Sequence, residues 1–173
     1  MIEKLDPAEF DTVYSIMEQS FPLEEYRPYQ GQKALLDHPS YGIYVAKEEH
    51  RIVGLAAVWQ LEGWVFLEHL AVDPRCRNRG IGAELLQYVS KDRACLEVEL
   101  PESELACRRI GFYERNGFFL NRYPYEQPSL GEGRSPVPLY IMTTGGAVTP
   151  EEFAQIRDQL YSRVYGYKKS EVK

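Results

Sequence analysis

The order of strand-like and helix-like stretches constrains the fold of this chain more than any other feature. Residues 41–47, 51–61 and 64–72 are rich in β-branched and aromatic side chains, and only short connections at 48–50 and 62–63 separate them. Connections this short join antiparallel neighbours, so we expect a meander of three strands. After residue 72 the apolar residues recur at helical spacing, and helical and strand-like stretches then alternate.

Together with the remaining stretches, this order predicts a fold of the α/β (α+β) class. Further strand candidates lie at 1–5, 94–100, 118–125 and 137–143, and helices are expected at 7–20, 29–37, 83–89, 103–115 and 149–167. Because a helix joins the strand ending at residue 72 to the one starting near residue 94, those two strands should be parallel neighbours. The prediction is a central mixed sheet of about seven strands, flanked by helices, with an extra C-terminal helix.

Size and charge narrow the class of protein. The 173 residues fit one domain, with 44% hydrophobic and 27% charged residues, as in ordinary globular proteins. The formal net charge of −6 repels polyanions, so we expect no nucleic-acid partner and a mild preference for a cationic substrate.

Cysteine usage and hydropathy indicate the compartment. Three cysteines without paired ligand spacing favour neither a disulfide framework nor a metal site, and suit a reducing cytoplasm. No apolar run is long enough for a membrane span or a signal peptide, so we expect a soluble cytoplasmic protein with no membrane partner.

The most informative segment is residues 70–82, with the sequence LAVDPRCRNRGIG. It predicts a strand, a basic loop and a helix start that carries glycines. The first amides of a helix lack partners and lie at the positive end of its dipole, so they can bind an anion. Gly80 and Gly82 let a phosphate approach the backbone, and the arginines add phosphate donors. Taken alone, the segment fits a solvated basic turn before an ordinary amphipathic helix better than it fits a phosphate site.

Residues 77–82 match the R/Q-x-x-G-x-G/A signature of the GCN5-related N-acetyltransferases (GNAT family), and the chain resembles that family. Residues 106–118, ACRRIGFYERNGF, are similar to a second family element, a helix followed by the start of a strand. The resemblance spans roughly 1–143 and is strongest over 67–118. It implies the GNAT-type acyl-CoA N-acyltransferase fold and acetyl-CoA as co-substrate, without a metal. The residues that it assigns to the cofactor are Leu70, Ala71, Val72, Arg77, Asn78, Arg79, Gly80, Ile81 and Gly82.

The resemblance also implies an enzyme that moves an acetyl group to a primary amine by direct attack. An amine is mostly protonated at neutral pH, so a base is needed. Strand alternation puts Glu68 on the same face as Leu70 and His69 on the opposite face, which makes Glu68 the candidate base. The equal alternative is an exposed strand carboxylate or a partner for a nearby arginine. Tyr113 matches the family position of the proton donor for the departing thiolate, with core packing as its alternative role.

The acceptor is a small-molecule or peptide amine that the sequence does not identify. The family places acceptor recognition in the first helices and the last hairpin, and Glu99 ends the neighbouring strand. The candidates for substrate binding are Phe21, Glu24, Glu25, Tyr26, Glu99 and Tyr125. Two rival functions stay open: an acyl-CoA-binding sensor that does not catalyse, and a nucleotide-binding domain.

We expect residues 1–173 to form a single domain, with a core over about 1–145 and a helical extension over 149–167. Tyr161, Tyr165 and Tyr167 lie near the end of that extension. Three roles stay open for it: packing on its own domain, covering the acceptor cleft, or docking on a second copy in a homodimer.

Overall fold

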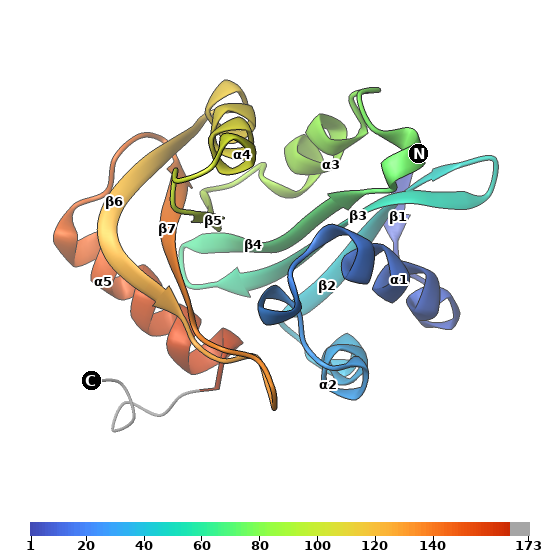
Figure 1. Ribbon diagram of the computed structural model, residues 1–173, viewed down its shortest axis with the longest axis horizontal. Helices are drawn as coiled ribbons and strands as arrows, with labels where there is room; N and C mark the ends of the chain where they lie inside the picture. The colour runs from blue at the N-terminus through green and yellow to red at the C-terminus, as the bar shows by residue number, and fades with distance from the viewer. Residues whose placement is uncertain (167–173) are drawn as a thin grey trace.

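The chain folds around one seven-stranded sheet in the order β1-β2-β3-β4-β5-β7-β6 (Figure 1). This computed structural model describes residues 1–166. The strands are β1 (Ile2–Lys4), β2 (Tyr41–Glu48), β3 (Arg51–Leu61), β4 (Trp64–Val72), β5 (Ala94–Glu99), β6 (Phe118–Gln127) and β7 (Val137–Thr144). The expected meander of β2, β3 and β4 is confirmed, and β4 pairs with β5 in parallel as predicted.

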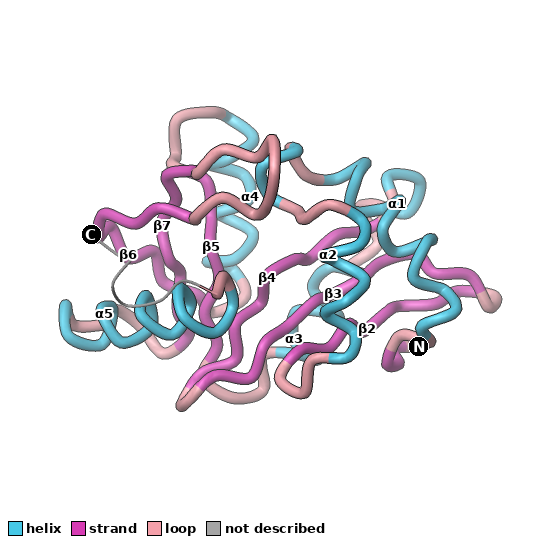
Figure 2. The backbone as a smooth tube through the Cα atoms, turned by 90° about the horizontal axis from the view of Figure 1, so that it is seen from below, coloured by secondary structure: helices cyan, strands magenta, loops and turns pink. Residues whose placement is uncertain are grey.

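Helices cover both faces of the sheet. They are α1 (Phe10–Ser20), α2 (Tyr29–Ala34), α3 (Ile81–Val89), α4 (Glu104–Arg115) and α5 (Pro150–Gln159), which continues as a wider π-helical turn, Leu160–Val164. Figure 2 shows α1, α2 and α5 on the near face, with α3 behind the sheet. Helix α4 lies with α3, because the two pack on the same hydrophobic cluster. The predicted fold class is therefore confirmed.

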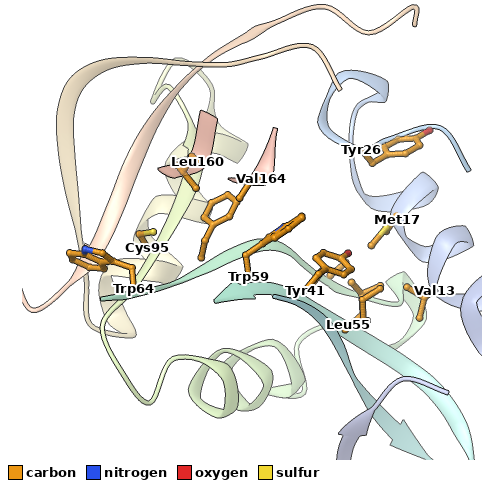
Figure 3. Packing of buried hydrophobic residues seen from close by; sticks show 14 of the residues in the cluster. Val13, Met17, Tyr26, Tyr41, Leu55, Trp59, Trp64, Cys95, Leu160 and Val164 are labelled. Atoms are coloured by element: carbon orange, nitrogen blue, oxygen red, sulfur yellow. The ribbon is translucent and has the colours of Figure 1, made fainter. Parts of the chain in front are cut away.

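Two hydrophobic cores lie on the two faces. The larger one joins α1, the sheet and α5. Figure 3 shows Trp59 and Tyr41 of the sheet between Met17 of α1 and Val164 of the π-helical turn. The smaller one lies under α3 and α4 and includes Leu85 and Ile110. The C-terminal helix thus packs on its own domain, the first of its three expected roles; Tyr167 lies outside the described residues.

The sheet divides between β4 and β5, and this division creates room for a site. The two strands pair only from Val65 to Leu67 on β4 and from Ala94 to Leu96 on β5. Beyond that point β5 pairs with β7 alone, and the later part of β4 pairs with β3 alone. Each strand therefore presents unpaired main-chain groups to the gap.

Candidate active site

A turn rich in bare amides lies at the start of α3. Gly80 is its N-cap, with φ 79°, and Asn78 has φ 65°, so both residues adopt left-handed backbone conformations. Gly80 has no side chain to cap the helix, and the amides that follow it lack carbonyl partners within the helix. The turn and the helix dipole together suit an anion.

The arginines of this turn point in different directions. Arg77 lines the cavity beside the turn and has no acidic partner in the described part of the chain. Arg79 instead forms an exposed ion pair with Glu48 at 3.2 Å and does not line the cavity. Of these two arginine side chains, Arg77 is therefore the one that can donate to a phosphate in the cavity. The other donors at this turn are main-chain amides.

A cavity of about 800 Å³ follows the division between β4 and β5. On one sheet face its walls come from the α3 turn and from α4, including Gly82, Phe112 and Tyr113. On the other face they come from the end of α1 and from β5, including Phe21 and Glu97. The cavity thus passes through the sheet from one helical layer to the other.

Most of the residues predicted for the site line this one cavity. They are Phe21, Glu25, Glu68, Leu70, Ala71, Val72, Arg77, Asn78, Gly80, Ile81, Gly82, Glu99 and Tyr113. Four predicted residues do not: Arg79, Glu24, Tyr26 and Tyr125. Tyr26 is buried against Tyr14 instead, and Tyr125 is buried against Phe153 and Tyr161.

A β-bulge corrects the prediction for Glu68 and His69. The register between β3 and β4 shifts so that Ala57 pairs with His69 and Val58 pairs with Leu67. Glu68 is the extra residue, and both Glu68 and His69 therefore face the α1 side, while Leu70 packs on the opposite face. The expected alternation, with Glu68 beside Leu70 and His69 opposite, is wrong because it assumed an unbroken strand.

Glu68 is held in a buried ion pair. Its side chain is 2% exposed, and one oxygen accepts from Arg27 Nη1 at 2.7 Å. The other accepts from the indole N–H of Trp59 at 2.7 Å. Burial by itself would raise the pKa of Glu68, but the Arg27 guanidinium, His69 and the two hydrogen bonds together lower it. Glu68 is therefore ionised and anchored at neutral pH.

A second carboxylate, Glu97 of β5, lies at the cavity wall. Tyr125 donates to one of its oxygens at 2.5 Å, and Tyr165 donates to the other at 2.7 Å. Burial raises the pKa of Glu97 to about 7, with smaller contributions from the negative charges of Glu68 and Glu25, while the two tyrosine hydroxyls oppose the rise.

The sequence-based prediction missed Glu97. The signal that could have found it is an acidic residue inside a buried strand: Cys95, Leu96 and Val98 are all buried around it.

The lining of the cavity also contains a mixed charge cluster of Glu25, Glu99 and Arg109. Burial and the neighbouring Glu99 raise the pKa of Glu25 to about 7, and Arg109 opposes this. Arg109 Nη1 lies 2.6 Å from Glu99 Oε1, in a half-exposed ion pair. The cluster carries two carboxylates against one guanidinium.

Tyr113 lines the cavity from α4, beside Phe112 and Phe118. Burial raises the pKa of its hydroxyl to about 12, although Arg109 opposes the rise. Tyr113 is thus a neutral phenol at any pH near 7. No hydrogen-bond partner for this hydroxyl exists within residues 1–166.

Two further findings concern the described residues, 1–166. They contain no group of three or more His, Cys, Asp or Glu side chains arranged to hold a metal ion. None of their helices combines the length and the apolar character that crossing a membrane requires.

Known proteins share both the sequence pattern and the fold. The family described as Acetyltransferase (GNAT) domain matches residues 39–119. A Bacteroides thetaiotaomicron protein assigned to the GNAT family of acetyltransferases is 30% identical, with a TM-score of 0.85, and the match covers 97% of this chain and 99% of that one. No curated protein matches the sequence.

More distant structures share the fold alone. Arabidopsis thaliana Naa50, in complex with the bisubstrate analogue CoA-Ac-MVNAL, has a TM-score of 0.61 at 20% identity, over 84% of this chain and 97% of its own. Salmonella typhimurium yncA, with its cofactor acetyl-CoA, has a TM-score of 0.62 at 16% identity, over 87% of this chain and 96% of its own. The match to the domain family and the relative that aligns along nearly the whole chain show that this protein belongs to the GNAT family of acetyltransferases.

Proposed function

We propose that the protein transfers an acetyl group from acetyl-CoA to a primary amine, by direct attack while both substrates are bound. One observation carries the proposal: a single cavity runs through the divided sheet from the bare amides of α3 to the carboxylate of Glu97. Two substrates that enter from opposite faces can therefore meet inside the sheet. The GNAT membership and the relative solved with acetyl-CoA support the choice of acetyl donor.

The cofactor half of the proposal depends on main-chain groups. The amides from Asn78 to Gly82 and the guanidinium of Arg77 suit a pyrophosphate. The unpaired edge of β4 from Leu70 to Val72 suits an extended chain with amide groups, such as pantetheine, which can bind as an added strand. The free amides near Leu70 can also stabilise a developing oxyanion.

We assign the general base to Glu97 in preference to Glu68. A base works best when its pKa lies near the working pH, and the surroundings of Glu97 meet that condition. Glu68 has a lowered pKa and both oxygens engaged, so the ion-pair alternative describes it better than the predicted base. Tyr113, neutral at working pH, is our proposed proton donor to the thiolate.

The proposed acceptor is a small-molecule or peptide amine that enters from the α1 side. Phe21 and Glu25 line this side, and Glu99 lines the same cavity. The excess of carboxylates favours an acceptor with positive charge. Naa50 was solved with a peptide-containing analogue, which supports a peptide amine as one of the classes to test.

A pH profile tests the assignment. In a thiol-release assay with acetyl-CoA and a panel of amines, kcat/KM should rise with pH through an apparent pKa of about 7, as Glu97 loses its proton. Glu97→Gln should lower kcat/KM by about 10²–10⁴-fold and remove this rise with pH, which is the acid limb of the profile. Tyr113→Phe should lower kcat and leave the limb in place.

Glu25→Gln is the matched control, because Glu25 lines the same cavity and has a similar pKa. The limb should survive in Glu25→Gln. A limb that disappears with Glu25→Gln and survives in Glu97→Gln would move the base to Glu25. Acetyl-CoA binding without turnover of any amine would identify a sensor, and a thermal shift with ATP or NAD but not with coenzyme A would reject acetyl transfer.

A further inference from the structure

The C-terminal end of α5 reaches the proposed catalytic carboxylate. After Gln159 the helix widens into the π-helical turn Leu160–Val164, and Tyr165 follows at its end. The hydroxyl of Tyr165 donates to Glu97 Oε1 at 2.7 Å, while Tyr125 of β6 donates to Oε2 at 2.5 Å. Two phenols from distant parts of the chain therefore hold both oxygens of one carboxylate.

The position of Tyr165 is fixed by buried contacts. Leu160 and Val164 are buried in the larger core, and the amide of Tyr165 bonds to the carbonyl of Leu160 at 3.0 Å. Arg27 donates to the carbonyl of Val164 at 3.4 Å, next to Tyr165. The same guanidinium pairs with Glu68.

The ion pair of Arg27 and Glu68 thus joins three elements at one point. It connects the segment before α2, the bulge in β4 and the turn that carries Tyr165. A carboxylate without Arg27 would be left buried and unpaired, and a guanidinium without Glu68 would lose its orientation towards Val164. Glu68 accordingly acts at a distance from the reacting atoms.

We propose that Tyr165 is a positioning residue that orients Glu97 towards the cavity, and that the Arg27–Glu68 ion pair holds the turn on which Tyr165 lies. This inference rests on the proposed function, since it assumes that Glu97 is the base. It gives the C-terminal helix a second role besides packing. A carboxylate held by two donors keeps its remaining lone pairs in a fixed direction, which proton transfer from a bound amine requires.

Several ionisable groups surround Glu97. Its titration is affected by Tyr125 and Tyr165, from β6 and the end of α5, by Glu68 of β4 and by Glu25 of the segment after α1. Cys95 of the same strand and Tyr161 of the π-helical turn also lie near it, and the charge of Glu97 acts on their own pKa values. The hydroxyls of Tyr125 and Tyr165 favour the charged form, and the two carboxylates disfavour it. Loss of one hydroxyl should therefore move the acid limb of the pH profile upward.

Tyr165→Phe tests the inference, because it removes the hydroxyl and keeps the ring. We expect kcat to fall about tenfold, the KM for acetyl-CoA to stay unchanged, and the acid limb to move up by about one pH unit, as the loss of a hydrogen bond to a charged group implies. Tyr161→Phe is the matched control: its hydroxyl donates to the carbonyl of Glu126, and its profile should match the parent protein.

The outcomes separate this inference from the proposed function. Suppose that Tyr165→Phe has the rate and pH profile of the parent protein while Glu97→Gln is inactive. That result would overturn the positioning role of Tyr165 but would not contradict the proposed acetyl transfer. Full activity in Glu97→Gln would instead overturn the proposed base. A carbon-13 NMR titration of Glu97 in the parent and in Tyr165→Phe gives a second measurement: the apparent pKa should rise in the variant, and an equal pKa would contradict us.

Discussion

At the scale of single residues, two carboxylates on neighbouring strands have opposite surroundings. Glu68 faces a guanidinium and an indole N–H, so its charged form is favoured and its pKa is lowered. Within residues 1–166, the donors to Glu97 are two neutral phenols, and burial raises its pKa to about 7. The same residue type is therefore a permanent anion in one place and a group that titrates near neutrality in the other.

The first prediction at this scale concerns stability. Arg27→Met should lower the free energy of unfolding by about 3–5 kcal/mol, because it leaves the Glu68 carboxylate buried without its cationic partner. Chemical denaturation measures the change. Adding Glu68→Gln to Arg27→Met should recover part of the loss, because the unpaired charge is then gone.

An exposed ion pair supplies the control for that measurement. Arg108 and Glu104 lie one helical turn apart on α4, and both side chains are largely exposed. Arg108→Met should cost less than about 1 kcal/mol. Equal losses at Arg27 and Arg108 would contradict the account of a buried pair.

At the scale of elements, the start of α3 has the geometry on which the proposed phosphate site depends. Gly82 lies in the first turn, and a Cβ placed there would be 3.6 Å from Phe112 Cζ and 3.6 Å from Val72 Cγ2. Both are ordinary contacts, so a Cβ at this position fits without displacing its neighbours. The glycine leaves the amides open on the cavity side.

Gly82→Glu should therefore abolish acetyl-CoA binding and leave the fold intact. The new carboxylate repels the pyrophosphate, while an acidic residue in the first turn of a helix is compatible with its dipole. Isothermal calorimetry measures the affinity and circular dichroism the melting temperature. Gly82→Ala is the control and should bind more tightly than Gly82→Glu; an affinity for acetyl-CoA unchanged in Gly82→Glu would remove the cofactor from this turn.

At the scale of the whole molecule, α5 is part of the larger hydrophobic core. Phe153, Ile156 and Leu160 are buried in the cluster that also contains Trp59 and residues of α1. The capping box at Thr149 and Glu152 fixes where the helix starts. We therefore propose that the chain unfolds as a single domain.

Ile156→Ala tests that proposal. It should lower the free energy of unfolding by about 2–5 kcal/mol, as expected for a large aliphatic side chain removed from a core. Unfolding followed by far-ultraviolet circular dichroism and by tryptophan fluorescence should show one coincident transition. Gln155→Ala, on the exposed face of α5, should change the stability by less than about 0.5 kcal/mol. An early transition confined to α5 would contradict a single domain.

The elements and the phosphate turn could be predicted because their causes are local in the sequence. Hydrophobic period, capping residues and short connections located all seven strands and the order of the helices. The anion-binding groups between Leu70 and Gly82 could be predicted from that segment alone. Free helix amides and glycines have these properties wherever the rest of the chain lies. The sequence by itself therefore determined the fold class, the family and the cofactor turn that we propose.

Only the tertiary structure decided how the proposed acceptor half of the site is built. A bulge in β4 turns the side chain of Glu68 towards Arg27. The sequence-based prediction missed this bulge because it assumed that side chains alternate regularly along the strand. Glu97 obtains its donors from Tyr125 and Tyr165, which are 28 and 68 residues away along the chain. Charge and orientation depend on neighbours brought together by folding, so the pKa of a buried carboxylate belongs to the assembled molecule and to no segment of its sequence.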